Sequence, residues 1–301
     1  MKSLTTFGRW RLIGMLAAVV ALVVAIPAAF GASSAGAKLK PQLQHQSKLV
    51  IVPSVLQQGP AVTKSTGSGT CAGGSIAPGT YSSLTITGFC TVDAGSVVVK
   101  HSLTVGHNAG LIAAFGGGPT LTVGGTLNVQ PNGVLVLGCE PEAFVCLNDP
   151  DQQVGTLSSK GTVFGNLKAH EALAVLVHNA FIGHNLVVTK GGGGVNCNSQ
   201  DALFGSPAYA TFEDTSIGGS ATIEHWHSCW LGFFRTTVEH NVDFSNNIVA
   251  DPDGNEVQTN NVGGNLTCRA NSPAAQAGDS GGSPNTVLGR ALGECTAISN
   301  P

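Results

Sequence analysis

Apolar residues recur along the chain in a seven-residue pattern: apolar, any residue, Gly or His, a small polar residue, apolar, any residue, apolar. Copies of the pattern begin at Val99, Val123, Val163, Ile182, Ile217, Val238 and Val262, and a weaker eighth copy begins at Ile86. The seven starts are separated by 24, 40, 19, 35, 21 and 24 residues. A period near 20 to 24 residues is typical of a fold built from stacked repeats.

Each copy predicts a tight corner followed by a short strand. Gly, or a short polar residue, adopts the positive φ that a corner can require. The closing apolar-any-apolar triplet alternates like a half-buried strand. We therefore expect one set of side chains to point into the core: Leu103, Val105, Leu127, Val129, Leu186 and Val188.

These features predict an all-β fold, a right-handed parallel β-helix (a solenoid) with loop insertions and disulfide-tied ends. The alternative is an antiparallel sandwich with regularly spaced strands. The fixed place of Gly or His in each copy favours the β-helix, and so does the scarcity of hairpin dipeptides such as Asn132-Gly133.

The N-terminus has the three parts of a secretory signal peptide. The basic residues Lys2, Arg9 and Arg11 precede an apolar run from 12 to 26, and the small-residue site Ala35-Gly36-Ala37 follows. We expect a signal peptide over residues 1–37, a secreted or cell-wall-associated product, and no stable membrane insertion after cleavage. An uncleaved membrane anchor is the alternative. Residues 38–70 are expected to form a flexible arm, and residues 71–301 the β-helix domain, with a C-terminal cap at 269–301.

All eight cysteines follow the predicted cleavage site, and export to an oxidising compartment favours disulfides. Their spacing suggests four local pairs: Cys71 with Cys90, Cys139 with Cys146, Cys197 with Cys229, and Cys268 with Cys295. Metal–thiolate sites are the other use of cysteine, but the chain has no C-x-x-C.

The charge balance argues against nucleic-acid binding. The chain has 14 basic and 17 acidic residues, and removing the three basic residues of the signal leaves 11 against 17, a net charge of −6. A nucleic-acid-binding protein usually presents a basic face. No phosphate loop or nucleotide-binding fingerprint occurs either, so we expect no cofactor.

A polysaccharide-active enzyme, a glycoside hydrolase or lyase, is the catalytic alternative, since glycoside cleavage usually needs two carboxyl groups. In the predicted outward columns only Glu224 and Asp243 approach each other, diagonally on neighbouring repeats. Acid pairs within one segment, such as Glu213-Asp214, are expected to be solvated.

The segment Glu224-His-Trp-His-Ser-Cys-Trp230 is the main candidate binding site. A strand continuing past Ile223 would place Trp226 and Trp230 outward beside Glu224, where aromatic faces can stack on sugar rings. His225, His227 and Cys229 would share the other face. The alternative is that these aromatics pack beneath a loop held by Cys229.

Metal sites are not expected. His225 and His227 supply only two ligands, which are too few for zinc. The corner histidines His101, His184 and His240 are separated by Gly-bearing repeats and are expected to be exposed. The segment 251–256 resembles part of a calcium loop, but a polar turn is the simpler interpretation.

The segments Asn261–Cys268, Pro284–Gly289 and Gly293–Cys295 resemble the C-terminal pattern of secreted actinobacterial β-helix proteins, which are mostly uncharacterised. The seven-residue pattern is more loosely similar to the polymer-forming bactofilin repeat. Neither resemblance implies a catalytic residue, and bactofilins are cytoplasmic proteins without such cysteines. We therefore expect an exported, non-catalytic scaffold that binds a cell-surface polysaccharide or a protein.

Overall fold

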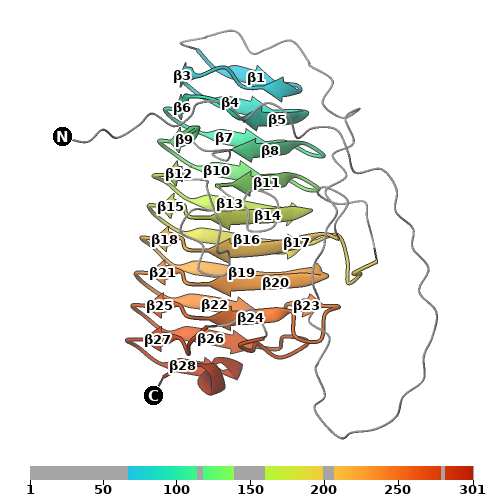
Figure 1. Cartoon of the computed structure of the whole chain (residues 1–301), viewed down its shortest axis with the longest axis vertical. Coiled ribbons are helices and arrows are strands. Elements are labelled where there is room, and N and C mark those ends of the chain that lie inside the picture. The colour runs from blue at the N-terminus through green and yellow to red at the C-terminus, as the bar shows by residue number, and fades with distance from the viewer. Residues whose placement is uncertain (1–66, 114–117, 139–159, 199–206, 279–281, 301) are drawn as a thin grey trace, which may run out of the picture. The chain divides into compact units, whose positions relative to one another are not determined.

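The computed structural model describes residues 67–113, 118–138, 160–198, 207–278 and 282–300. These residues form a parallel β-helix, in which three parallel sheets run along the stack (Figure 1). The predicted fold class is therefore confirmed. None of the helical structure in these ranges is long and apolar enough to cross a membrane.

Sheet A contains the strand that the closing triplet of each copy of the seven-residue pattern forms. Its strands, in spatial order, are β1 (Gly69–Cys71), β4 (Leu84–Ile86), β7 (Leu103–Val105), β10 (Leu127–Val129), β13 (Leu167–Ala172), β16 (Leu186–Gly191), β19 (Ala221–Ser228), β22 (Val242–Ser245), β26 (Leu266–Arg269) and β28 (Ala291–Gly293). The short strand β23 (Ile248–Val249) pairs with β19.

Sheets B and C complete each rung. Sheet B contains β2 (Gly74–Ser75), β5 (Phe89–Val92), β8 (Gly110–Ala113), β11 (Val134–Leu137), β14 (Ala174–His178), β17 (Tyr209–Glu213), β20 (Trp230–Phe234) and β24 (Asn255–Gln258). Sheet C contains β3 (Gly79–Tyr81), β6 (Ser96–Val99), β9 (Thr120–Val123), β12 (Lys160–Val163), β15 (Phe181–Ile182), β18 (Ser216–Ile217), β21 (Thr237–Val238), β25 (Asn261–Val262) and β27 (Thr286–Val287).

The core lies inside the stack, where equivalent residues of successive rungs meet. Leu127 pairs with Leu103 on one side and with Leu167 on the other, so one apolar column runs along sheet A. The six predicted inward residues, from Leu103 to Val188, are all buried. Because each rung covers the apolar face of its neighbour, the stack gains its stability from burial between rungs.

The seven-residue pattern forms the corner between sheets C and A, but the role predicted for its glycines is wrong. None of the pattern glycines Gly125, Gly165, Gly219 and Gly264 has a positive φ. A Cβ at Gly125 would instead lie 2.6 Å from the carbonyl oxygen of His101, one rung earlier. Glycine is needed here because successive backbones approach closely, and not for a left-handed conformation.

The weak copy at Ile86 is also misplaced, because Ile86 ends a strand of sheet A. The first corner instead follows Tyr81, which pairs with Val99, and has only two residues, Ser82 and Ser83. A further corner follows Val287, which pairs with Val262. The first of these copies was not recognised in the sequence because it begins with Tyr81 in place of an aliphatic residue and its corner is one residue shorter.

The small polar residue of the pattern links successive corners through its side chain. The backbone N–H of Asn185 donates to Oδ1 of Asn166, and the N–H of Ser220 donates to Oδ1 of Asn185. The same bond repeats from Asn265 to Asn241 and from Arg290 to Asn265. Each short polar side chain thus satisfies a backbone donor that the corner leaves outside the sheets.

Left-handed residues occur at the other two bends. Between sheets A and B these are Asn108 and Asn132 in two early rungs, and then Glu171, Lys190, His225, Asn246 and Ala270, the last five each four residues after the first apolar residue of its strand. Between sheets B and C they are Asn179, Asp214, Arg235 and Thr259. The chain therefore turns at these two bends through single residues with positive φ.

Buried asparagines form ladders inside these bends. Oδ1 of Asn260 accepts a hydrogen bond from the backbone N–H of Thr236. The backbone N–H of Asn260 donates in turn to Oδ1 of Asn285. A second ladder runs from Trp226 through Asn247 to Asn271 and ends at the carboxylate of Glu294. These amides give the buried backbone donors at the bends a partner.

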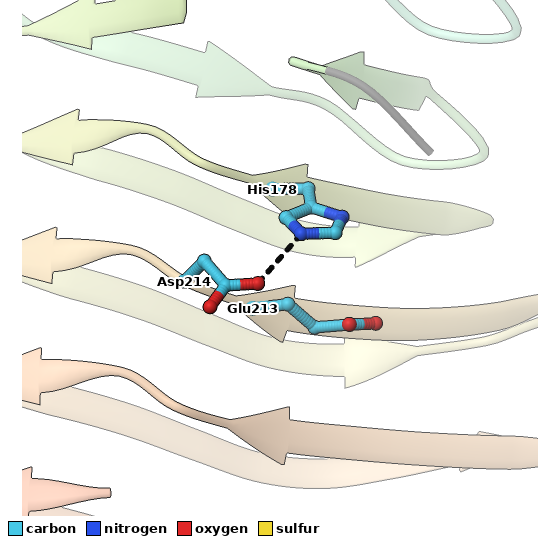
Figure 2. A group of neighbouring side chains, drawn as sticks. All are labelled: His178, Glu213 and Asp214. Atoms are coloured by element: carbon cyan, nitrogen blue, oxygen red, sulfur yellow. Dashed lines mark hydrogen bonds and ion pairs between the residues drawn. The ribbon is translucent and has the colours of Figure 1, made fainter. Parts of the chain in front are cut away.

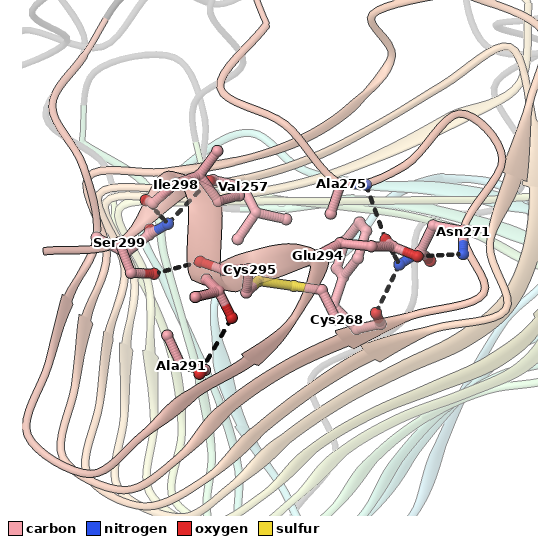
Figure 3. Close-up of a disulfide and its surroundings, with 12 residues drawn as sticks. Val257, Cys268, Asn271, Ala275, Ala291, Glu294, Cys295, Ile298 and Ser299 are labelled. Atoms are coloured by element: carbon pink, nitrogen blue, oxygen red, sulfur yellow. Dashed lines mark hydrogen bonds between the residues drawn. A yellow bond between two sulfur atoms is a disulfide. The ribbon is translucent and has the colours of Figure 1, made fainter. Parts of the chain in front are cut away.

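Disulfides lie near both ends of the stack. Cys71 pairs with Cys90 in the first rungs, and Cys268 pairs with Cys295 in the 3-10 helix η2 (Glu294–Ile298), as the spacing predicted (Figure 3). Cys197 pairs with Cys229, also as predicted, whereas the predicted pair Cys139–Cys146 lies outside the described residues. Strand β1 begins at Gly69, so the predicted arm extends two residues too far.

Candidate functional site

The predicted aromatic platform at Glu224–Trp230 does not form. Trp226 has no exposed surface, while His225 and His227 on either side of it are exposed. The cause is His225, whose φ of 57° bends the chain between sheets A and B. Because this bend reverses the alternation of side chains after Glu224, Trp226 turns into the core.

Trp226 packs under the glycine run instead. An added Cβ at Gly192 would lie 2.9 Å from Cε2 of its indole, so this approach requires glycine. The indole Nε1 donates to Oγ of Ser228 at 2.9 Å. Together with the Cys197–Cys229 disulfide, these contacts support the alternative prediction, that the aromatic packs beneath a loop held by Cys229.

Trp230 does lie on the outward face of sheet B, but it is half-buried and held by neighbours. Its ring stacks on Phe234 with centroids 5.6 Å apart, across Gly232, where a Cβ would collide with both rings. The ring of Tyr209 contacts Trp230 edge to face, with centroids 6.1 Å apart, and Nε1 of Trp230 donates to Glu256 at 2.9 Å. The indole therefore belongs to a packed aromatic cluster.

The two carboxylates of the enzyme hypothesis lie where the sequence predicted them. Asp243 pairs with Thr222 and Glu224 pairs with Ser245, so Glu224 and Asp243 are diagonal neighbours on β19 and β22. Asp243 is already engaged, because Ser245 bonds to its Oδ1 and Arg269 to its Oδ2. The arrangement is that of a surface ion pair, with Arg269 61% exposed.

A buried polar cluster lies where sheet B ends, formed by His178, Glu213, Asp214 and Arg235 (Figure 2 shows the first three). His178 Nε2 lies 2.7 Å from Oδ2 of Asp214. Arg235 donates from Nε to Asp214 at 3.0 Å and from Nη2 to Glu213 at 2.8 Å. The prediction that Glu213-Asp214 is solvated is wrong, since these side chains are only 8% and 16% exposed.

Arg235 is the fixed positive charge beside the two acids of this cluster. Burial alone would raise the pKa of Asp214, but hydrogen bonds from His178 and Arg235, with the positive charge of Arg235, hold this pKa below its ordinary value of 3.8. Although His178, Glu213 and Asp214 are close enough to share a metal ion, the guanidinium of Arg235 already donates hydrogen bonds to both acids. The residues form an ion-pair network between three rungs.

Sequence reasoning missed this cluster because its members lie outside the seven-residue pattern. They occupy the fourth and third positions before a copy: His178 before Ile182, Glu213 and Asp214 before Ile217, and Arg235 before Val238. Extending the alignment of the copies backward by four residues would have placed all four on adjacent rungs.

The described corners between sheets C and A carry no insertion. From β6 to β28, all eight corners between sheets C and A are three residues long. The longer connections lie at the other bends, such as 138–159 between β11 and β12 and 192–208 between β16 and β17. We call the outward side of sheet C, with these corners, the insertion-free face; in Figure 1 the sheet C labels form one column along the stack.

The insertion-free face has little charge. Lys160 is the one charged residue in the nine strands of sheet C, and the eight three-residue corners add Lys100, Glu239 and Arg290. The corner histidines His101 and His184 are exposed, as expected, and so is His240. Two aromatic residues protrude from this face: Phe164 is 53% exposed and Phe181 is 41% exposed.

Comparison with protein-family models, curated proteins and solved structures gives no match to the chain.

Proposed function

We propose that the protein is an exported, non-catalytic scaffold that binds a neutral surface polysaccharide along its insertion-free face. The observation that carries the proposal is the run of eight equal corners, which leaves a regular, sparsely charged surface over the length of the stack. Strands in a sheet repeat at about 4.8 Å, so this surface offers the same groups at fixed intervals. A polymer of identical units suits a surface of that kind.

The composition of the face fits a neutral, hydroxyl-rich ligand. The outward column of sheet C consists mainly of hydroxyl and amide side chains: Thr80, Val98, Thr122, Thr162, Phe181, Ser216, Thr237, Asn261 and Thr286. Such side chains both donate and accept hydrogen bonds. An anionic polymer would need a basic face, and the sequence of these strands and corners holds only three basic residues, Lys100, Lys160 and Arg290.

Three disulfides point to an oxidising, extracellular environment for the folded protein. Export through the predicted signal peptide is part of the proposal. A binding role also fits the catalytic candidate Asp243, which is paired with Arg269.

Affinity electrophoresis tests the proposal. The secreted protein would run through native gels containing xylan, galactomannan or mixed-linkage β-glucan as neutral probes, and polygalacturonate as an anionic probe. We expect retardation by at least one neutral polysaccharide and none by polygalacturonate. Retardation by polygalacturonate alone, or by no probe, would contradict the proposal, and release of sugar products would show that the protein is an enzyme.

A charge variant locates the binding surface. Thr122→Glu/Thr237→Glu places two carboxylates on the insertion-free face, on β9 and β21, and should abolish the retardation. The matched control, Ala250→Glu/Ala297→Glu, adds the same charge at two exposed positions outside this face and should leave retardation unchanged. Equal effects of both variants would show that binding occurs elsewhere.

A further inference from the structure

We propose that Phe164 and Phe181, with the hydroxyls of Thr162 and Ser216, form a subsite for one neutral pyranose unit. This inference rests on the proposed function and names the place on the insertion-free face where recognition is strongest. The two rings are in contact edge to face, with centroids 6.2 Å apart and planes inclined by 69°. They come from consecutive rungs, Phe164 from the corner after β12 and Phe181 from β15.

Phe181 stands between two hydroxyl side chains in the outward column of sheet C. It pairs with Thr162 on one side and with Ser216 on the other. Neighbouring strands are about 4.8 Å apart, so each hydroxyl lies one strand spacing from the ring. A sugar ring combines an apolar C–H face with a rim of hydroxyls. An aromatic ring flanked by hydroxyl groups matches both parts.

Glycines leave space around Phe164. The equivalent corner position is Gly124 in the preceding rung, and Gly183 and Gly218 in the two rungs that follow. The backbones approach so closely there that a Cβ at Gly183 would collide with the carbonyl oxygen of Phe164. Glycine backbone without side chains therefore borders the ring of Phe164, which leaves space for a flat ligand against the two aromatic rings.

The size and charge of the feature favour a sugar over a protein partner. A stable protein interface buries about 800 Å² on each side, with an apolar centre. Here two partly exposed rings are surrounded by glycine, threonine and serine. No acid occupies the strands of sheet C or the corner of Phe164, so a cationic ligand has no partner there.

The test measures retardation of Phe164→Ala and Phe181→Ala by the neutral polysaccharide that retards the wild-type protein. Loss of one aromatic contact should weaken binding about three- to tenfold in each variant. Ser216→Ala, which removes one exposed hydroxyl, should weaken it about two- to fivefold. The control is Ile248→Ala, which removes an apolar side chain of similar exposure from β23. Unchanged thermal unfolding would confirm that each variant folds.

The outcomes separate the subsite from the broader proposal. If the Thr122→Glu/Thr237→Glu variant loses binding while both phenylalanine variants bind like the wild type, the face binds polysaccharide and the subsite is wrong. If Ile248→Ala weakens binding as much as Phe181→Ala, the subsite is also wrong. Absence of wild-type binding to every neutral probe would overturn both proposals.

Discussion

Nε2 of His178 lies 2.7 Å from Oδ2 of Asp214, and this contact joins two successive rungs through an imidazole with no exposed surface. Because hydrogen bonds and a neighbouring arginine keep Asp214 ionised, Nε2 carries the proton of this bond. The second ring nitrogen, Nδ1, has no hydrogen-bond partner among the described residues. The stability of the stack therefore depends on the ionisation of the Asp214 carboxyl group.

The first prediction concerns stability at low pH. The pKa of Asp214 is lower in the folded chain than its ordinary value of 3.8, so the unfolded chain takes up the proton first as the pH falls. Its contribution to the free energy of unfolding is present above about pH 4 and is lost as the pH falls through the folded pKa. Asp214→Asn should unfold in urea with a flatter pH dependence below about pH 5.

Asp243→Asn is the matched control for this experiment. Asp243 is also paired with an arginine, but Arg269 is 61% exposed, and such a surface pair contributes less than about 1 kcal/mol. The control should keep the pH dependence of the wild type. A wild-type pH profile in Asp214→Asn would show that this carboxyl does not link pH to stability.

The second prediction contrasts the buried Trp226 with the exposed Phe164. Trp226 is fully buried, so Trp226→Ala should lower the free energy of unfolding by about 3–5 kcal/mol. Trp226→Phe fills most of the space and should bind polysaccharide like the wild type. Phe164→Ala, at a 53% exposed position, should change stability by less than about 0.5 kcal/mol. Selective loss of binding in folded Trp226→Phe would restore a direct role for this residue.

The inward positions could be predicted from sequence because a strand alternates its faces, and Leu103 to Val188 followed that rule. The rule fails at bends, since one residue with positive φ, such as His225, reverses every face that follows it. Histidine as a residue type does not predict the positive φ of His225. The buried cluster was missed for a related reason: His178 and Asp214 are 36 residues apart and meet only when the register is known.

The third prediction concerns the asparagine ladder. Asn260 is buried and bonds to the backbones of Thr236 and Phe233, while its own N–H donates to Asn285. Asn260→Leu keeps a similar volume and leaves a buried donor and a buried acceptor without partners, which should cost about 2–4 kcal/mol. The control Asn241→Ala, at an exposed corner, should cost about 1 kcal/mol or less. Equal urea midpoints for both variants would contradict this account.

The fourth prediction concerns the C-terminal disulfide. Cys268 and Cys295 are separated by 27 residues, and closing a loop of that size stabilises a chain by about 3–4 kcal/mol. Cys268→Ala/Cys295→Ala should unfold at lower urea, and residues 270–300 should then be cleaved first by protease. The N-terminal pair provides the comparison: Cys71→Ala/Cys90→Ala should be cleaved first near residue 71 instead. The same first cleavage site in both variants would contradict local capping.

The equal corners have a consequence for the length of the protein. Residues 239–262 form one complete rung of 24 residues, and Val262 at its end is equivalent to Val238, the residue just before it. Joining Val238 directly to Gly263 would restore a three-residue corner and bring Asn271 to the place beside Trp226 that Asn247 now holds. Both end disulfides would remain. The molecule is thus modular: whole rungs can be removed or duplicated in evolution or by design, while insertions of other lengths belong at the two remaining bends.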